Sequence, residues 1–265
     1  MAEPTLTARH PKGRKAAALA GANTFLWAVF DSSVGAKVIV ALSGLGLVGF
    51  TIFHMIGNLK VFQGPEAING YAYFLTHNLG ALIWLARLGL LGIFLLHLTL
   101  AIRLTLRSRA ARPIGYAYPG HVQATVTSRT MIWSGAVVGL FVLFHLAHFT
   151  FGLVHGAEVE PGKVVNYLEL KDAKDPLKHD VYSMVVAGFT TPWLAVLYIV
   201  SQLVLFLHLL HGVQSAFQTL GLKNNRFAPV IRLAGVAVAL VILAGNLFIV
   251  IGVWAGLAEP LYKTI

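Results

Sequence analysis

Long apolar stretches alternate with short polar segments along this chain. Five apolar stretches lie near residues 35–59, 80–106, 130–154, 192–220 and 230–257. Each holds at least about 20 residues, which is enough for a helix to cross about 30 Å of hydrocarbon. The pattern therefore predicts an all-α fold, an integral membrane bundle of five transmembrane helices.

The polar segments divide the rest of the chain. We expect a basic N-terminal arm at 1–33, the five-helix membrane domain at 34–258 and a short tail at 259–265. The arm has room for an amphipathic helix around Ala16–Phe30. Residues 60–79 are expected to form a loop, because Gly64 and Pro65 are a turn signal. Segment 155–191 is the longest between two spans and has room for a small ordered unit.

Composition supports a membrane protein and limits its chemistry. Apolar residues make up 57% of the chain and charged residues 11%, whereas soluble domains average about 25% charged residues. The chain has no cysteine. Disulfides, thiolate metal sites and ligation of an iron–sulfur cluster by this chain are therefore excluded. Any redox cofactor held here must use histidine, methionine or oxygen ligands.

The net charge of +10 indicates membrane orientation rather than a nucleic-acid partner. If the N-terminus is inside, the inner segments hold 13 basic residues and the outer segments hold seven. The acidic residues also cluster on the outer side. The positive-inside rule therefore predicts that the N-terminus lies inside and the C-terminus outside.

Histidines occur inside four of the five apolar stretches. They are His54, His97, the pair His145 and His148, and the pair His208 and His211. Imidazole is polar and is costly in hydrocarbon unless it has a partner. A function that uses intramembrane histidines is therefore expected.

Helical depth sorts the histidines into two pairs. His54 and His145 follow the basic residue at the inner end of their helix by 17 and 16 residues, so they lie roughly 25 Å from it. His97 and His208 precede the inner basic residue by 10 and 15 residues, so they lie roughly 15–22 Å from it. Spans one and three thus supply an outer pair, and spans two and four an inner pair.

Two histidines at one depth on different helices meet the requirement for bis-imidazole haem ligation. Two such pairs would form an electron path between the membrane faces. The small residues needed beside a flat ring are present as Gly44, Gly46, Gly49, Gly89, Gly92, Gly139 and Gly212. Small residues also serve ordinary helix packing in membranes, so they are weak support.

Two other interpretations use the same histidines. Each can be a hydrogen-bonding residue between helices in a haem-free structural protein. A metal transporter would also use histidine ligands, but it predicts carboxylates among the helices. All ten acidic residues lie outside the spans or at their ends, which counts against a cation transporter. Spacing alone does not choose between His145 and His148, or between His208 and His211.

The four histidine motifs together resemble a known family. They are GFTIFHMIGNLKVF around His54, RLGLLGIFLLHLTLAIRL around His97, VLFHLAHFTFG around His145 and LFLHLLHGVQSAFQTLG around His208. In order and spacing they resemble the membrane-anchor cytochrome b subunit of succinate dehydrogenase and fumarate reductase, in its five-helix, single-chain, two-haem form. The resemblance covers roughly residues 35–257.

The resemblance implies a ligand set. The four haem ligands fall on His54, His97, His145 and His208. The family pattern selects His208 because it stands four residues before the glycine that opens GVQSAFQTLG, and it selects the first histidine of HLAHF. It implies that His54 and His145 hold the outer haem iron, and that His97 and His208 hold the inner one. His148 and His211 remain candidates for groups beside the haems.

The resemblance also implies a role in a larger complex of the bacterial cytoplasmic membrane. Flavoprotein and iron–sulfur subunits would dock on the cytoplasmic face. Two b haems would carry electrons between the iron–sulfur subunit and a quinone, either menaquinone or ubiquinone, in succinate oxidation or fumarate reduction. This chain would not act on the dicarboxylate itself. Assembly of complexes into a higher oligomer, such as a trimer, is compatible with this role.

One departure from the family concerns proton transfer. Some members carry a glutamate two residues before the fourth ligand, and here that position is Phe206. A proton route through that position is therefore not expected.

Several polar residues are candidates for contact with haem propionates or quinone. Basic residues at helix ends commonly anchor a span at the interface, but a propionate near hydrocarbon also needs a charged or hydroxyl partner. The candidates are Ser43, Arg87, Arg103, Arg129 and Arg226. The quinone would bind either near Asn58–His77 or on the inner face. An alternative function is a di-haem cytochrome b of another respiratory enzyme, such as a hydrogenase, a formate dehydrogenase or an ascorbate-type reductase.

Overall fold

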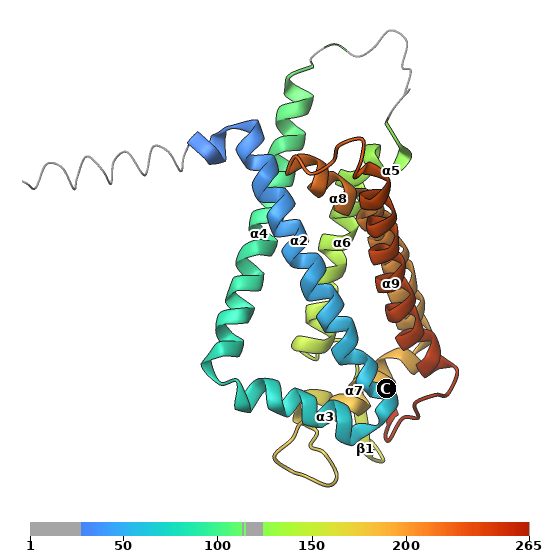
Figure 1. Ribbon diagram of the computed structural model, residues 1–265. Helices are drawn as coiled ribbons and strands as arrows, with labels where there is room; N and C mark the ends of the chain where they lie inside the picture. The colour runs from blue at the N-terminus through green and yellow to red at the C-terminus, as the bar shows by residue number, and fades with distance from the viewer. Residues whose placement is uncertain (1–27, 113, 115–123, 265) are drawn as a thin grey trace, which may run out of the picture.

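Five long helices form the bundle (Figure 1). The computed structural model describes residues 28–112, 114 and 124–264. Its long helices are α2 (Ser33–Asn58), α4 (Ala81–Ala110), α6 (Met131–His145), α8 (Pro192–Thr219) and α9 (Ala228–Trp254). All five are long and apolar enough to cross a membrane when the continuation of α6 is included. Long apolar helices are thus confirmed at all five predicted positions, with ends that differ by a few residues. The predicted helix at Ala16–Phe30 lies almost wholly outside the described residues.

Local chemistry sets where the helices begin. The Ser32 side chain caps α2 by accepting a hydrogen bond from the Gly35 N–H at 2.8 Å. Pro192 and Pro229 stand in the first turns of α8 and α9, where a missing N–H costs nothing. The end of α6 widens into the π-helix η3 (Leu146–Thr150), a rare form that is often found at functional sites.

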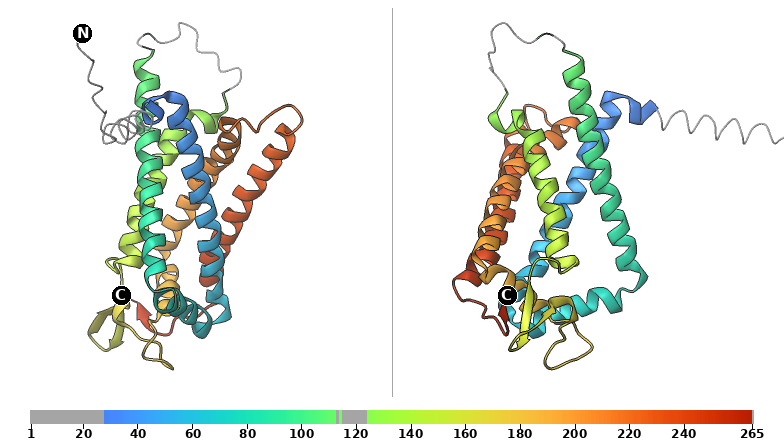
Figure 2. Two further views of the ribbon diagram at one scale, coloured as in Figure 1. Left: turned by 60° about the vertical axis from the view of Figure 1, so that its left-hand side comes forward. Right: turned by 180° about the vertical axis from the view of Figure 1, so that it is seen from behind.

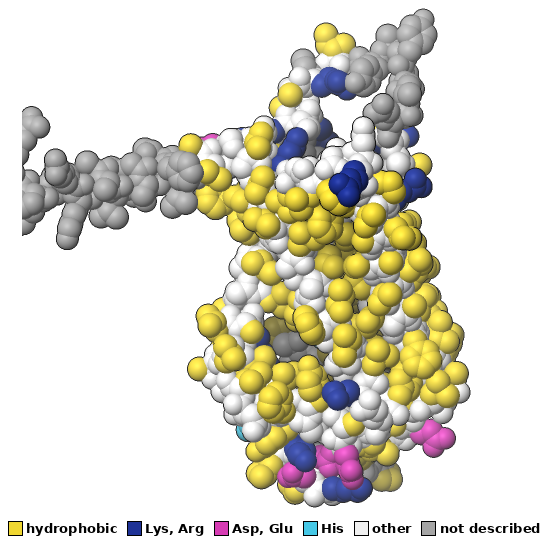
Figure 3. Space-filling view, in the orientation of Figure 1, with side chains coloured by type: hydrophobic (Ala, Val, Ile, Leu, Met, Phe, Trp, Pro, Cys, Tyr) yellow, Lys and Arg dark blue, Asp and Glu magenta, His cyan; other side chains and the backbone are white. Residues whose placement is uncertain are grey.

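The helices pack in a defined order. Helix α2 packs against α4 and α8, α6 packs against α8, and α8 packs against α9. Helix α4 meets the bundle mainly through its second half. Its residue Leu100 is buried, whereas residues 84–89 are exposed. A hollow therefore separates the first half of α4 from α2 in the space-filling view (Figure 3).

One end of the bundle is covered by a cap, made of residues 59–80, 151–191 and 255–264. Its first part is η1 (Leu59–Gln63), α3 (Pro65–Tyr73) and η2 (Phe74–Asn78), which lie across the end of the bundle (Figures 1 and 2). The prediction of a loop at 60–79 is therefore wrong. Gly64 takes φ 92°, and Pro65 then starts α3, so the turn signal opened a helix.

The second part of the cap contains the only strands among the described residues. They are β1 (Gly156–Glu160), β2 (Lys163–Asn166) and β3 (Lys263–Thr264), in the order β2-β1-β3 with antiparallel pairing. The short η4 (Tyr167–Glu169) and α7 (Val181–Thr190) follow the hairpin. The fold is thus a helical bundle with a small sheet, a departure from the purely α class predicted.

A buried amide locks the two parts of the cap together. The Asn69 Nδ2 donates to carboxylate oxygens of Asp172 at 2.8 Å and Asp180 at 3.3 Å. The Tyr182 N–H donates to Asn69 Oδ1 at 2.9 Å. All four residues are buried. Because each polar atom is satisfied, α3 is held in one position against α7. The end of the bundle at the cap is called the cap side below, and the opposite end the arm side.

Candidate functional site

On the arm side, His97 of α4 is held by α2. Its Nδ1 lies 3.0 Å from the Val40 carbonyl oxygen and 3.2 Å from the Ser43 Oγ. The Ser43 hydroxyl donates its own proton to the Ile39 carbonyl at 2.7 Å, so it accepts from His97. A Cβ on Gly44 would come within 2.9 Å of the His97 ring, so the glycine is needed for this contact.

The same arrangement recurs between α6 and α8. His208 Nδ1 lies 3.1 Å from the Ser134 Oγ, and that hydroxyl donates to the Met131 carbonyl at 3.1 Å. A Cβ on Gly135 would come within 3.3 Å of the His208 ring. His208 is also close enough to His97 for an electrostatic interaction between the two imidazoles. His97 and His208 thus each lie against a serine and a glycine of a neighbouring helix.

The predicted outer pair meets on the cap side. The rings of His54 and His145 have centroids 5.7 Å apart and are nearly perpendicular, at 87°. Phe50 stacks on His54, and Phe141 contacts His145. On α2, His54 lies 11 residues beyond the serine that contacts His97, so the two levels are about 16 Å apart along the helix.

The four imidazoles differ in their hydrogen bonds. The Nδ1 of His145 lies 3.2 Å from the Tyr198 hydroxyl. In His97, His208 and His145 the protein therefore engages Nδ1 and leaves Nε2 for another partner. His54 makes no hydrogen bond with any other described residue and is exposed in the bare chain. An imidazole inside an apolar span needs a polar or metal partner, and both ring nitrogens of His54 are available for one.

This donor set fits haem better than a bare metal ion. Among the described residues, no group of three or more His, Cys, Asp or Glu side chains could hold a metal ion. Two axial imidazoles are enough for a haem iron, because the macrocycle supplies the other ligands. A backbone or hydroxyl acceptor at Nδ1 is also the usual support of a metal-binding histidine. The residues present therefore fit two bis-histidine haems.

His148 and His211, which each stand three residues after a predicted haem ligand, have other environments. His148 is fully buried, and its Nδ1 lies 2.9 Å from the Tyr198 hydroxyl. Its Nε2 lies 2.9 Å from Nδ1 of His155. Both nitrogens of His148 are therefore engaged by protein. His211 stands one helical turn after His208 on α8.

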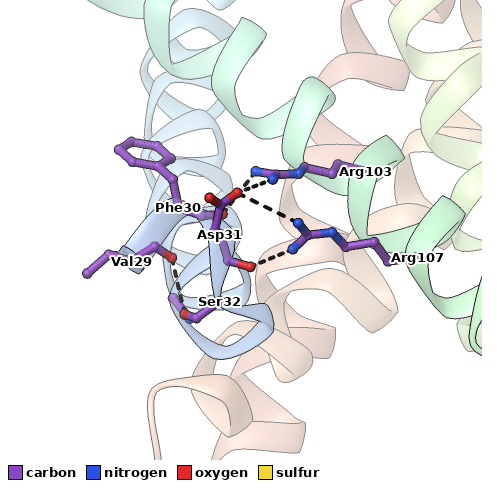
Figure 4. A network of polar contacts seen from close by, with 7 residues as sticks. Val29, Phe30, Asp31, Ser32, Arg103 and Arg107 are labelled. Carbon is purple, nitrogen blue, oxygen red and sulfur yellow. Dashed lines mark hydrogen bonds and ion pairs between the residues drawn. The ribbon is translucent and has the colours of Figure 1, made fainter. Parts of the chain in front are cut away.

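The candidate propionate residues are spread over the molecule. Arg103 pairs with Asp31 and donates to the Phe30 carbonyl at 3.1 Å, while Arg107 donates to the Asp31 carbonyl at 2.6 Å (Figure 4). This cluster ties the residues before α2 to α4. Ser43 contacts His97, as described above.

The other basic candidates lie at helix ends. The Arg87 guanidinium lies 4.9 Å from the Trp84 ring centre in the exposed first half of α4. Arg129 ends the short helix α5 (Val126–Arg129), and Arg226 lies 5.8 Å from the Phe227 ring centre. In the candidate quinone region Asn58–His77, the ring of His77 stacks on Tyr73 at 4.1 Å.

A repeated motif could have revealed the arm-side contacts from the sequence. Residues 43–54 read SGLGLVGFTIFH and residues 134–145 read SGAVVGLFVLFH. They share Ser, Gly, Phe, Phe and His at five of twelve positions. Sequence analysis missed Ser134 and Gly135, which this repeat marks. It also missed Tyr198 and His155, for which the chain offers no comparable signal.

No protein-family profile matches the chain, and neither a curated protein nor a solved structure matches it. We therefore infer the function from the geometry of the histidines and from the resemblance of their motifs.

Proposed function

We propose that this protein is the membrane-anchor cytochrome b of a succinate:quinone oxidoreductase. It would pass electrons between an attached iron–sulfur subunit and quinone through two bis-histidine b haems. The observations that carry the proposal are the ring contact of His54 with His145 and the matching serine and glycine contacts of His97 and His208 at a second level. Ordinary packing histidines have no reason to leave Nε2 free at both levels, because an unsatisfied polar atom in hydrocarbon is costly.

The residues of the chain would bind and orient the haems. Nε2 of His97 and His208 would bind one iron, and Nε2 of His54 and His145 the other. Haem iron, when bound, supplies reversible uptake of one electron. Val40, through its carbonyl, and the serine hydroxyls fix the rings of the arm-side pair and keep their Nε2 atoms unprotonated.

The two levels suit electron transfer across a membrane. Their separation of about 16 Å along α2 is half the thickness of the hydrocarbon layer. The apolar helices around them would exclude water from both sites. The five spans contain no acidic residue, so the chain offers no carboxylate relay for protons among these helices.

Charge distribution supports an orientation for this proposal. Lys and Arg side chains lie at both ends of the molecule, with the acidic side chains mainly in the cap (Figure 3), so the arm side carries the excess of positive charge. The positive-inside rule then puts the arm side in the cytoplasm of a bacterial cell and the C-terminus outside. The flavoprotein and iron–sulfur subunits would dock on that basic face, nearest to the pair His97 and His208.

The first experiment is a haem count on the full chain, expressed with haem supplied. A dithionite-reduced minus oxidised spectrum with a pyridine haemochrome assay is expected to give about two b haems per chain. Replacement of His54 by Ala should lower the count to about one. His77→Ala, which changes an exposed histidine of the cap, is the matched control and should leave the count unchanged. A chain without haem would overturn the proposal.

The partner is tested separately. The protein purified from its native membranes should carry a flavoprotein and an iron–sulfur protein, and succinate should reduce its haems. Two haems per chain with reduction by hydrogen or formate, and none by succinate, would keep the haem sites and overturn the assignment to a succinate:quinone oxidoreductase.

A further inference from the structure

A line of hydrogen bonds runs from the cap to the cap-side histidine pair. The Met184 carbonyl oxygen of α7 lies 3.3 Å from Nε2 of His155. His155 Nδ1 lies 2.9 Å from Nε2 of His148. Nδ1 of His148 lies 2.9 Å from the Tyr198 hydroxyl, which lies 3.2 Å from Nδ1 of His145. Five groups from three separate segments thus form one continuous chain.

The direction of every bond in this chain follows from its first member. A carbonyl oxygen only accepts, so Nε2 of His155 must carry the proton. In a neutral imidazole the other nitrogen then accepts, so His148 donates from Nε2 and accepts at Nδ1. The Tyr198 hydroxyl is the donor to that Nδ1. Its oxygen therefore accepts from Nδ1–H of His145, whose Nε2 is left unprotonated.

The environment keeps these imidazoles neutral. Burial lowers the pKa of His155 below its ordinary value, by more than the hydrogen bond to the Met184 carbonyl raises it. His148 is fully buried and stacks on Phe149 with ring centroids 3.9 Å apart. A Cβ on Gly188 of α7 would come within 3.0 Å of the His148 ring, so the ring fits tightly against that helix. The polar contacts of the chain are with one another and a carbonyl, which offers no counter-charge.

We propose that the Met184 carbonyl, acting through His155, His148 and Tyr198, fixes the tautomer of His145 and so presents its Nε2 as a metal-binding nitrogen. The three side chains are positioning residues, because they act through His145. The use of that Nε2 as a haem ligand rests on the proposed function, but the tautomers of the chain do not. The cap thereby becomes part of the cap-side site although it contributes no ligand.

The test reads the protonated nitrogen of each ring directly. The full chain, expressed with haem and labelled with ¹⁵N-histidine, is reconstituted in lipid and reduced, so that any low-spin haem iron is diamagnetic. Solid-state ¹⁵N spectra are then recorded, and loss of single signals in His148→Gln and His155→Leu assigns these two rings. We expect Nε2–H in both rings and Nδ1–H in His145. Nδ1–H in His148 would overturn the proposal.

The chain of hydrogen bonds from the Met184 carbonyl to His145, called the relay, is tested by replacing a residue far from His145. In His155→Leu the Nε2–H of His148 loses its acceptor, so the ratio of its Nε2–H to Nδ1–H forms should fall about tenfold. His77→Leu makes the same change at an exposed histidine and should have no effect. Tyr198→Phe removes the hydroxyl that accepts from Nδ1–H of His145, so the ¹⁵N signal of that nitrogen should change. Tyr182→Phe, at another buried tyrosine, should leave that signal unchanged. No response of His148 or His145 to these cuts would also overturn the proposal.

The haem count of the same sample separates the two proposals. The expected tautomers in a chain that holds no haem would keep the relay and overturn the proposed function. Two haems with His148 in the Nδ1–H form would do the reverse.

Discussion

In the helix pairs α2–α4 and α6–α8, the contacts of the histidines are alike on the arm side and different on the cap side. In each pair, the first helix offers Ser-Gly to the histidine of the second. His97 meets Ser43, and His208 meets Ser134, at 3.2 and 3.1 Å. Both contacts are made between two helices, and in each the serine and the glycine are consecutive residues of the first helix.

The cap-side halves differ at one equivalent position. The residue ten positions before the histidine of the second helix is Arg87 in α4 and Tyr198 in α8. Tyr198 is buried and contacts His145, whereas Arg87 lies at the exposed start of α4 against Trp84. Helix α8 is preceded by the buried α7, and α4 begins beside the hollow. The repeated motif thus gives both helix pairs the same histidine contacts on the arm side. On the cap side the contacts differ between the two pairs, because α8 packs against α7 of the cap whereas the first half of α4 is exposed.

The largest effect is expected when the arm-side pair His97 and His208 is replaced. If the proposed function is right, His97→Ala and His208→Ala should each lower the count from about two haems to about one, because each would remove one ligand of the same iron. The double variant should lose no more than either single variant. Optical spectra and haemochrome counts measure this. A double variant without any haem would show that the two histidines serve different haems.

The glycines sharpen the comparison between the two arm-side contacts. Gly44→Ala puts a Cβ 2.9 Å from the His97 ring, and Gly135→Ala puts one 3.3 Å from the His208 ring. Overpacking of this kind costs about 1–3 kcal/mol, so both variants should lose arm-side haem, and Gly44→Ala should lose more. The haem content after purification measures it.

Gly70→Ala is the control for these two variants. It makes the same change in helix α3, where a Cβ meets nothing within 4 Å. We expect full haem content. Equal losses from all three substitutions would mean that the arm-side glycines have no special contact with the imidazoles.

The cap is the next target, because it ties the segment after α2 to the segment before α8. Asn69→Leu would leave the carboxylates of Asp172 and Asp180 and the Tyr182 N–H without their buried partner. Each such loss costs about 1–3 kcal/mol, so the cap should open at lower temperature. Limited proteolysis of segment 151–191 during heating measures this opening. An unchanged profile would remove Asn69 as the lock.

Acid should weaken the same lock. Burial raises the pKa of Asp172, but hydrogen bonds from Asn69 and from backbone N–H groups outweigh it, so the pKa lies below the ordinary value of 3.8. The carboxylate therefore contributes stability that is present above pH 3.8 and is lost as the pH falls through the lower folded pKa. Proteolysis between pH 5 and pH 3 should show this loss in the native chain and less of it in Asp172→Asn.

The smallest effect is expected where Asp31 ties the start of α2 to α4. Its ion pairs with Arg103 and Arg107 are exposed, so Asp31→Asn should change the unfolding free energy by about 0–1 kcal/mol. The effect should shrink as salt is raised, which a thermal melt at two salt concentrations measures. A large loss of arm-side haem in this variant would instead link Arg103 to the haem site.

The sequence by itself determined the five spans, because about 20 consecutive apolar residues have few alternatives to a membrane helix. It also determined the two levels of histidine, since a rise of 1.5 Å per residue converts position into depth. The repeat of 43–54 in 134–145 marks the serine and glycine of both arm-side contacts, but only the fold shows that His97 and His208 lie against them.

Only the tertiary structure decided what surrounds the cap-side pair. Segment 60–79 became a helix, segment 156–166 a hairpin that pairs with the tail, and His155 reached His148 through the packing of α7. These contacts join residues far apart in the chain through shape and hydrogen-bond geometry, for which no periodic pattern is required. The membrane imposes a regular pattern on the spans, whereas the cap outside it obeys only its own packing.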